Sequence, residues 1–188
     1  MNLQKVLLIL GVIAALVAGY VIYNKNPEIT TSNKEPEIKI DNTTKRPDLS
    51  NATFTFDNER VTLKNGEDNS PLSDNPNISQ TTTLTDKVAY GDLNGDQKED
   101  AVALLVQSGA GTGIFVYIGA YVSGSVRYSG SNTIFVGDRI IPQSIDIDKN
   151  IITVNYLDRE EDEPLAATPT KSVIKTYVYI GGELKSIE

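Results

Sequence analysis

Short runs of β-branched and aromatic residues, separated by Gly, Asn and Asp, dominate the chain from residue 51 to residue 188. Such runs are typical of β-strands, and no apolar stripe with the period of a helix extends over three turns here. The pattern predicts an all-β fold: a single antiparallel β domain, built as a sandwich or an open barrel-like sheet, with roughly eight to ten strands. The predicted strands are residues 53–56, 61–63, 101–106, 114–122, 133–136, 144–148, 151–156, 173–180 and 183–187.

Three kinds of segment in the predicted domain have distinctive sequences: one of the strands, the tight turns and a long loop. Residues 101–106 (AVALLV) are apolar without interruption, which indicates a strand buried on both faces. Residues 57–59, 148–150 and 181–182 are rich in Asp, Asn and Gly and predict tight hairpin connections. Residues 65–85 are polar and rich in turn formers, so they predict a long surface loop.

The first 25 residues form a separate unit. Residues 6–23 carry no charge and are flanked by Lys5 and Lys25. A helix of these 18 residues spans about 27 Å, close to the ~30 Å hydrocarbon thickness of a bilayer. We therefore predict one N-terminal transmembrane helix within residues 1–25 that anchors the protein in the membrane. A cleaved signal peptide and a buried core helix are the alternatives.

Residues 26–50 predict a disordered, Pro-containing linker. Pro27, Pro36 and Pro47 alternate with charged and hydroxylated residues, so the segment has little apolar surface to bury. All acidic residues of the chain lie beyond residue 25. The segment before residue 6 is short and positively charged, one predicted membrane span follows it, and the rest of the chain is acidic. This arrangement predicts that residues 51–188 lie outside the cytoplasm.

Composition narrows the chemistry available to this domain. The chain contains 17 basic and 25 acidic residues, a formal net charge of −8, and neither Cys, His nor Trp. An acidic protein of this kind is not expected to bind nucleic acid, because such binding relies on Lys and Arg at the phosphates. Thiol, imidazole and disulfide chemistry are excluded as well. The groups that remain available for catalysis or ion binding are carboxylates, carbonyls, hydroxyls and the amines of Lys.

The strongest local signal is the segment GDLNGDQKED, directly before the predicted strand AVALLV. Asp92, Asn94, Asp96 and Asp100 occupy positions 1, 3, 5 and 9 of an oxygen-ligand loop, and the carbonyl of Lys98 falls at position 7. Clustered carboxylates repel each other unless a hard cation neutralises them, and sites made only of oxygen ligands select calcium or magnesium. The segment predicts a single calcium site. An acidic Asx-type turn without an ion is the alternative.

This segment resembles the calcium loops of FG-GAP and VCBS repeats, which read D-x-[DN]-x-D-G-x-x-D before a strand. The resemblance implies that the same residues bind Ca²⁺. The motif occurs once in the chain, so the propeller architecture of those families is not implied. Gln97 stands where the families have glycine. A left-handed conformation at that position costs a non-glycine residue roughly 1 kcal/mol, so a distorted loop or a weaker site is expected.

A wider resemblance covers about 130 residues. It rests on residues 91–96, on the Ser/Gly-rich turn of residues 108–113 before Phe115 and Tyr117, and on residues 137–140 (GDRI). In these features the chain is similar to a group of uncharacterised bacterial envelope proteins with an N-terminal hydrophobic segment. The resemblance implies a place in the bacterial cell envelope and brings no activity with it.

Other features favour structural roles. Residues 109–113 (GAGTG) lack the Lys-Ser/Thr ending of a phosphate loop and precede a strand, so a hairpin turn is favoured. Asp138 and Arg139 favour a structural ion pair over a ligand anchor, and residues 158–163 (DREEDE) a solvated loop over a second cation site. Cross-strand packing is favoured over a glycan platform for seven tyrosines: Tyr90, Tyr117, Tyr121, Tyr128, Tyr156, Tyr177 and Tyr179.

Two functional classes fit these observations. The first is a membrane-tethered, calcium-stabilised module outside the cytoplasm, without catalytic activity, that binds an envelope protein or polysaccharide or serves a structural role. The second is an envelope hydrolase of the glycosidase type, because a pair of carboxylates can work without His or Cys. A deep pocket holding two carboxylates would favour the hydrolase, and a shallow exposed face would favour the module.

Overall fold

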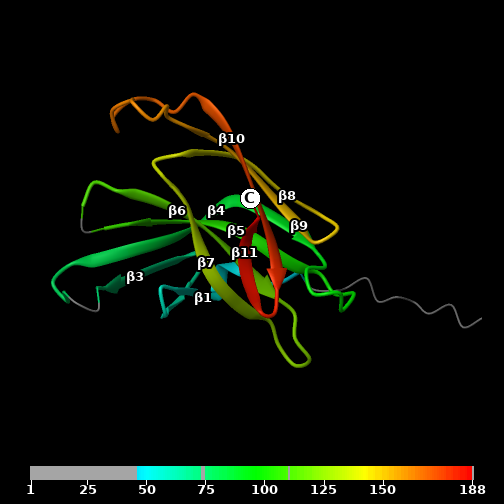
Figure 1. The fold of residues 1–188 in the computed structure, drawn as a ribbon. Coiled ribbons are helices and arrows are strands. Elements are labelled where there is room, and N and C mark those ends of the chain that lie inside the picture. The colour runs from blue at the N-terminus through cyan, green and yellow to red at the C-terminus, as the bar shows by residue number, and fades with distance from the viewer. Residues whose placement is uncertain (1–45, 73–74, 110, 188) are drawn as a thin grey trace, which may run out of the picture. The chain divides into compact units, whose positions relative to one another are not determined.

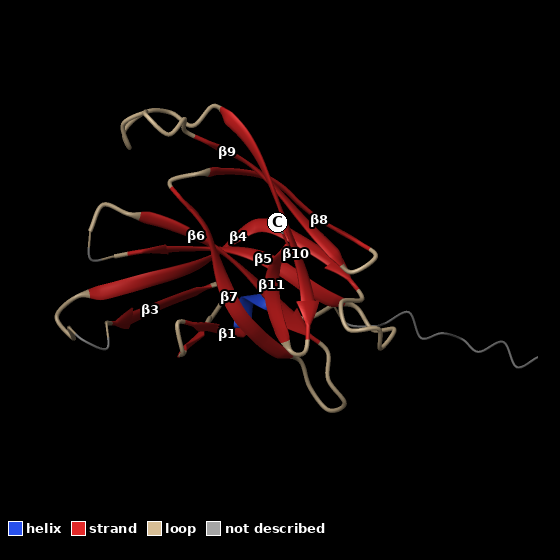
Figure 2. Cartoon of the chain, in the orientation of Figure 1, coloured by secondary structure: helices blue, strands red, loops and turns tan. Residues whose placement is uncertain are grey.

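The computed structural model describes residues 46–72, 75–109 and 111–187, which form an all-β structure (Figure 1). Apart from strands, these residues contain one short 3-10 turn, η1 (Leu49–Asn51), which is drawn in blue in Figure 2. The predicted membrane helix and residues 26–45 of the predicted linker lie outside the described residues. Within the described part, no helix is long and apolar enough to cross a membrane. Pro47 and Leu49 are buried, so packing against the β structure begins before residue 51.

Seven strands form the larger sheet, in the order β2-β1-β7-β6-β5-β4-β3. Neighbouring strands are antiparallel except β1 and β7, which run parallel and share the single registered pair Thr55 and Asn132. The prediction of a purely antiparallel domain is therefore wrong at this pair. The strands are β1 (Thr53–Phe56), β2 (Glu59–Thr62), β3 (Glu67–Pro71), β4 (Ser79–Gly91), β5 (Asp100–Ser108), β6 (Ile114–Val122) and β7 (Ser129–Asp138).

The second sheet has four antiparallel strands in the order β11-β10-β9-β8. At one side Gly91 of β4 lies so close to Ile147 of β8 that an added Cβ would be 3.0 Å from its side chain. At the other side the amide of Asn132 bonds to both backbone groups of Leu184 in β11, which lies beside β7 in Figure 1. The two sheets thus form a nearly closed, barrel-like wall. The strands are β8 (Ile141–Asp148), β9 (Ile151–Asp158), β10 (Lys171–Ile180) and β11 (Glu183–Ile187).

Strand β5 separates two hydrophobic cores and is buried on both faces, as its unbroken apolar sequence predicts. Alternate side chains of a strand point to opposite faces. Val102 and Leu104 belong to the inner core between the two sheets. Ala103 and Leu105 belong to the outer core beneath the β1–β2 hairpin. The outer core also contains Leu49, Ala52, Phe54, Phe56, Leu63 and Ala101.

Two-residue turns close three of the hairpins at the predicted positions. Both central residues of each turn have positive φ: 43° and 77° in the β1–β2 turn, 47° and 68° in the β8–β9 turn, and 65° and 92° in the β10–β11 turn. These are the turns whose twist matches that of paired strands, and they favour Asn, Asp and Gly. The turn residues are Asp57, Asn58, Lys149, Asn150, Gly181 and Gly182.

The prediction of a long loop over residues 65–85 is wrong. Strand β3 pairs with the first half of β4 in register from Glu67–Thr83 to Pro71–Ser79. Strand β3 is an edge strand whose residues are mostly exposed, so it has no apolar alternation to reveal it in the sequence. Strand β4 begins with a Thr-rich run that is half-buried, and β-branched Thr suits such a surface.

Candidate functional site

The acidic loop (residues 92–100) connects β4 to β5 at one end of the larger sheet. Asp92 organises its first half by accepting hydrogen bonds from three backbone amides. Its Oδ1 atom accepts from Gly95 at 2.7 Å and from Asp96 at 3.2 Å, and its Oδ2 atom accepts from Gln97 at 2.9 Å. Gln97 has φ 65°, the left-handed conformation that the calcium-loop resemblance implies at this position. The Asp92 carboxylate therefore holds the turn in shape.

Asp96 and Asn94 connect the acidic loop to the β6–β7 loop (residues 123–128). Asp96 Oδ2 accepts the hydroxyl of Ser123 at 2.6 Å, and Asn94 Nδ2 donates to the Ser123 carbonyl at 2.9 Å. The hydrogen bond from Ser123 is the main reason why the pKa of Asp96 lies below its usual value. Lys98 lies 3.5 Å from the same carboxylate and donates to the Gly124 carbonyl.

Asp100 is fully buried at the base of the acidic loop. Its Oδ1 atom accepts the Ser123 amide and its Oδ2 atom accepts the Leu93 amide, each at 2.8 Å. The amide, carbonyl and hydroxyl of Ser123 are therefore all bonded to the acidic loop. Together with the hydrogen bond from Tyr128 to the Glu99 carbonyl, these contacts tie the two loops into one unit.

The predicted calcium ligands are only partly brought together. Within the described residues, no three acidic side chains converge into a set that could hold a metal ion. Asp92, Asn94 and Asp96 are exposed, and an oxygen that accepts a single amide hydrogen bond keeps a second lone pair for an ion, as Asp92 Oδ2, Asn94 Oδ1 and Asp96 Oδ1 do. Asp100 is buried, and its two carboxylate oxygens accept backbone amides. Among the predicted ligands, the exposed side-chain oxygens belong to Asp92, Asn94 and Asp96.

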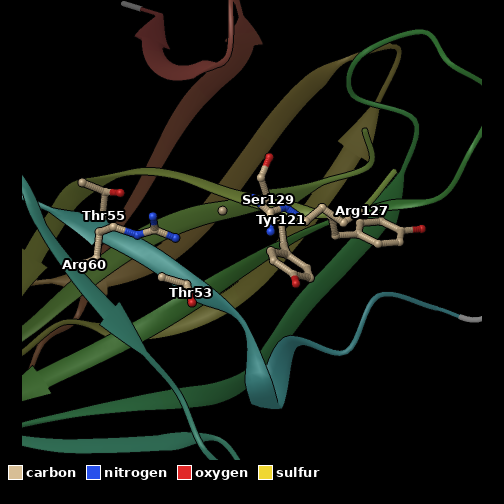
Figure 3. A pocket seen from close by; sticks show the side chains of 8 residues that line it. Thr53, Thr55, Arg60, Tyr121, Arg127 and Ser129 are labelled. Atoms are coloured by element: carbon tan, nitrogen blue, oxygen red, sulfur yellow. The ribbon is translucent and has the colours of Figure 1, made fainter. Parts of the chain in front are cut away.

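A polar groove lies beside the β6–β7 loop, where β1 runs next to β7 (Figure 3). Its volume is about 480 Å³. Figure 3 shows Arg60 reaching into the groove on the side of β1, with Tyr121 and Arg127 opposite. Gly130 permits the close approach of the two strands, because a Cβ atom there would lie 1.8 Å from the Thr53 carbonyl oxygen. The groove is lined by Thr53, Thr55, Arg60, Tyr121, Arg127, Tyr128, Ser129 and Gly130.

The groove has an aromatic wall and two guanidinium groups that form no ion pair with a described residue. Tyr121 and Tyr128 stack with their ring centroids 5.5 Å apart and their planes inclined by 20°. Arg60 and Arg127 take part in none of the ion pairs found among the described residues. By contrast, Arg46 near the same tyrosines is paired with Glu99 and stacks on Tyr90. Sequence reasoning missed this groove because Arg60 and Arg127 are far apart in the chain and belong to no motif.

The glycine run and the acidic run occupy peripheral loops. Residues 109 and 111–113 belong to the β5–β6 connection, beside a hollow of about 140 Å³ whose lining includes no basic residue. In the β9–β10 connection, Glu160 pairs with Lys171 at 2.8 Å and Glu163 accepts the Glu160 amide. These contacts agree with a turn and a solvated loop.

The Asp138–Arg139 pair has structural contacts on every side. Asp138 Oδ1 accepts the Ile114 amide, and Arg139 bonds to the carbonyl and hydroxyl oxygens of Thr112. Arg159 donates to the backbone carbonyls of both residues. The pair fastens the β7–β8 corner to the start of β6, which favours the structural interpretation.

Most of the tyrosines pack between strands. Tyr117 contacts Phe56 and Phe135 edge to face, with centroids 5.1 and 5.7 Å away. Tyr156 and Tyr177 belong to the inner core. Burial raises the pKa of the Tyr177 hydroxyl above its ordinary value. Tyr121 and Tyr128 are different, because they line the groove.

Comparison with known proteins gives no relative from which a role could be transferred. No protein-family model matches the sequence, and neither the curated proteins nor the solved structures contain a match.

Proposed function

We propose that this chain is a membrane-tethered module outside the cytoplasm, with a binding or structural role at the cell envelope and no catalytic role, and that calcium stabilises it. The predicted helix within residues 1–25 anchors the protein, and the predicted linker, residues 26–50, holds the β structure away from the membrane surface. The observation that carries the proposal is the bonding of Ser123 to three residues of the acidic loop. An ion bound beside Ser123 would stiffen both loops at once.

Calcium suits the oxygen ligands of the acidic loop. Asp92, Asn94 and Asp96 present hard oxygen ligands at the exposed side of a tight turn, which is the ligand type that calcium prefers. The ion has to compete with the ammonium group of Lys98 for Asp96. With few charged ligands and this competitor, we expect a dissociation constant of about 0.1–1 mM, typical of extracellular calcium modules.

A hydrolase built on two carboxylates has less support. Such an enzyme needs two acidic side chains about 5–10 Å apart on either side of a substrate. The lining of the Arg60–Arg127 groove includes no acidic side chain. Two other hollows have one acidic side chain each in their lining. Asp48 lines a hollow together with Tyr121, and Asp92 lines another together with Gly95. None of the hollows described here supplies a pair.

Thermal unfolding of the full chain with calcium and with a chelator tests the proposal. At free calcium about ten times the dissociation constant, binding to the folded state alone adds about 1.4 kcal/mol of stability. For a domain of this size we expect a rise in Tm of about 5 °C. Asp96→Ala should abolish this rise, and Gln97→Gly should reach it at lower calcium because glycine adopts positive φ without strain.

Asp162→Ala is the matched control, because Asp162 is an exposed acid outside the acidic loop. This variant should keep the full calcium-dependent rise. Identical melting curves with calcium and with chelator would instead leave an acidic turn without an ion.

A further inference from the structure

We propose that the groove between Arg60 and Arg127 binds an anionic sugar, meaning a saccharide that carries carboxylate or phosphate groups. The inference goes beyond the calcium-dependent role proposed above and needs neither the ion nor the membrane anchor. It rests on three properties of the groove: its charge, its aromatic wall and its free hydroxyl groups.

The charge of the groove is opposite to that of the molecule. The chain carries a formal net charge of −8, yet this groove is lined by two arginines and by no acidic residue. Neither guanidinium forms an ion pair with a described residue. Each guanidinium offers a planar fork of N–H donors that fits a carboxylate or phosphate with two parallel hydrogen bonds.

The aromatic wall points to a ring-shaped ligand with an apolar face. The stacked rings of Tyr121 and Tyr128 form this wall, and the Tyr128 hydroxyl is already bonded to the Glu99 carbonyl. Aromatic side chains with one polar end are suited to ligands that have both an apolar surface and hydrated polar groups. A pyranose ring has an apolar C–H face and a rim of hydroxyls, so it matches such a wall.

Hydroxyl groups complete the match. The side chains of Thr55 and Ser129 line the groove and form no hydrogen bond with another described residue, whereas the Thr53 hydroxyl is paired with that of Thr62. Free hydroxyls can donate to or accept from the hydroxyls of a sugar. The groove volume of about 480 Å³ is within the ~300–1,000 Å³ range of small-molecule sites.

Isothermal titration calorimetry on the full chain in a non-ionic detergent tests the inference. The probes are tetragalacturonate, its neutral counterpart galactotetraose, and glucose 6-phosphate, each titrated with calcium and again with a chelator. We expect heat of binding for at least one charged sugar and none for the neutral one. The affinity should fall as sodium chloride is raised, because the attraction is between exposed charges. Binding of the uronate alone identifies carboxylate as the anion, and binding of the phosphate alone identifies phosphate.

Substitutions locate the site. Arg60→Ala and Arg127→Ala should each weaken binding by roughly tenfold or more, because each removes a charge-assisted hydrogen-bonding group. Arg60→Lys should fall between wild type and Arg60→Ala, since it keeps the charge and loses the fork. Lys171→Ala, which removes an exposed charge at the start of β10 that does not line the groove, should bind as wild type does. Because both arginines are exposed, their variants should keep the wild-type Tm.

Any of the following results would overturn the inference: neither charged sugar binds, with calcium or with chelator; the neutral and charged tetrasaccharides bind equally; or both alanine variants bind with full affinity. Tighter binding of an oligoglutamate peptide than of the charged sugars would also overturn it, because the ligand would then be an acidic protein segment.

Discussion

Asp100 and Ser123 show how single residues connect distant loops. The buried carboxylate of Asp100 accepts one amide from its own loop, at Leu93, and one from the β6–β7 loop, at Ser123. Both hydrogen bonds are charge-assisted and shielded from water, so each contributes more than an exposed hydrogen bond. Asp100 thus has a structural role, in addition to the ligand role that its spacing in the sequence predicts.

Replacing Asp100 tests this structural role. Asp100→Asn keeps the shape of the side chain but turns one of its two acceptor atoms into a donor that faces a backbone amide. We expect the free energy of unfolding to fall by about 2–3 kcal/mol, the cost of one unsatisfied buried amide and one weakened bond. Urea unfolding of the full chain measures it, with Asp162→Asn as the exposed control. An unchanged midpoint would show that the two amides do not depend on the charge.

The sequence identified the acidic loop but not its partners. The spacing of Asp92, Asn94 and Asp96 predicted a curled loop, and the glycine pattern of similar loops predicted the left-handed Gln97 that the structure shows. Ser123 lies 23 residues from Asp100 and is an ordinary serine in a polar turn. Contacts of this kind depend on strand order, which a local pattern does not encode.

At the scale of elements, apolar runs and turn residues predicted most strands and failed where a strand is polar. Strand β6 (Ile114–Val122) and strand β11 (Glu183–Ile187) have the predicted bounds. Strand β3 was missed because both of its faces carry polar residues and it owes its conformation to pairing with β4. Pairing across a sheet can impose a strand on a sequence with little preference for one.

Strand β5 allows an element-scale prediction, because it contributes to two cores. Leu104 and Leu105 are neighbours on opposite faces, and both are fully buried. Leu104→Ala and Leu105→Ala should each reduce the free energy of unfolding by about 2–5 kcal/mol, the usual cost of a cavity in a packed core. Ile174→Ala on β10, where the side chain is 65% exposed, should change it by less than about 0.5 kcal/mol. Chemical denaturation measures all three, and a large loss from only one leucine would show that β5 has a single buried face.

At the scale of the whole molecule, the proposed tether decides where the β structure works. The uncharged residues 6–23 should keep the full chain in the membrane fraction through high-salt and carbonate washes. Protease added outside intact cells should then digest the β structure. A variant that starts at residue 26 should be released by the same washes. Recovery of a mature soluble form that begins near Tyr20 would instead identify a signal peptide.

The parallel contact between β1 and β7 has a consequence for the order in which the chain folds. The β1–β2 hairpin is made early during synthesis, but its sheet partner follows much later: Thr133 bonds to the Thr55 carbonyl across 78 residues. An isolated two-stranded hairpin is marginally stable in water, and long-range pairing is slow. Phe54 and Phe56 therefore stay exposed to solvent until most of the remaining strands have been synthesised. The β1–β2 hairpin is synthesised before the rest of the β structure and completed late, which makes it the part of the β structure most in need of protection from aggregation.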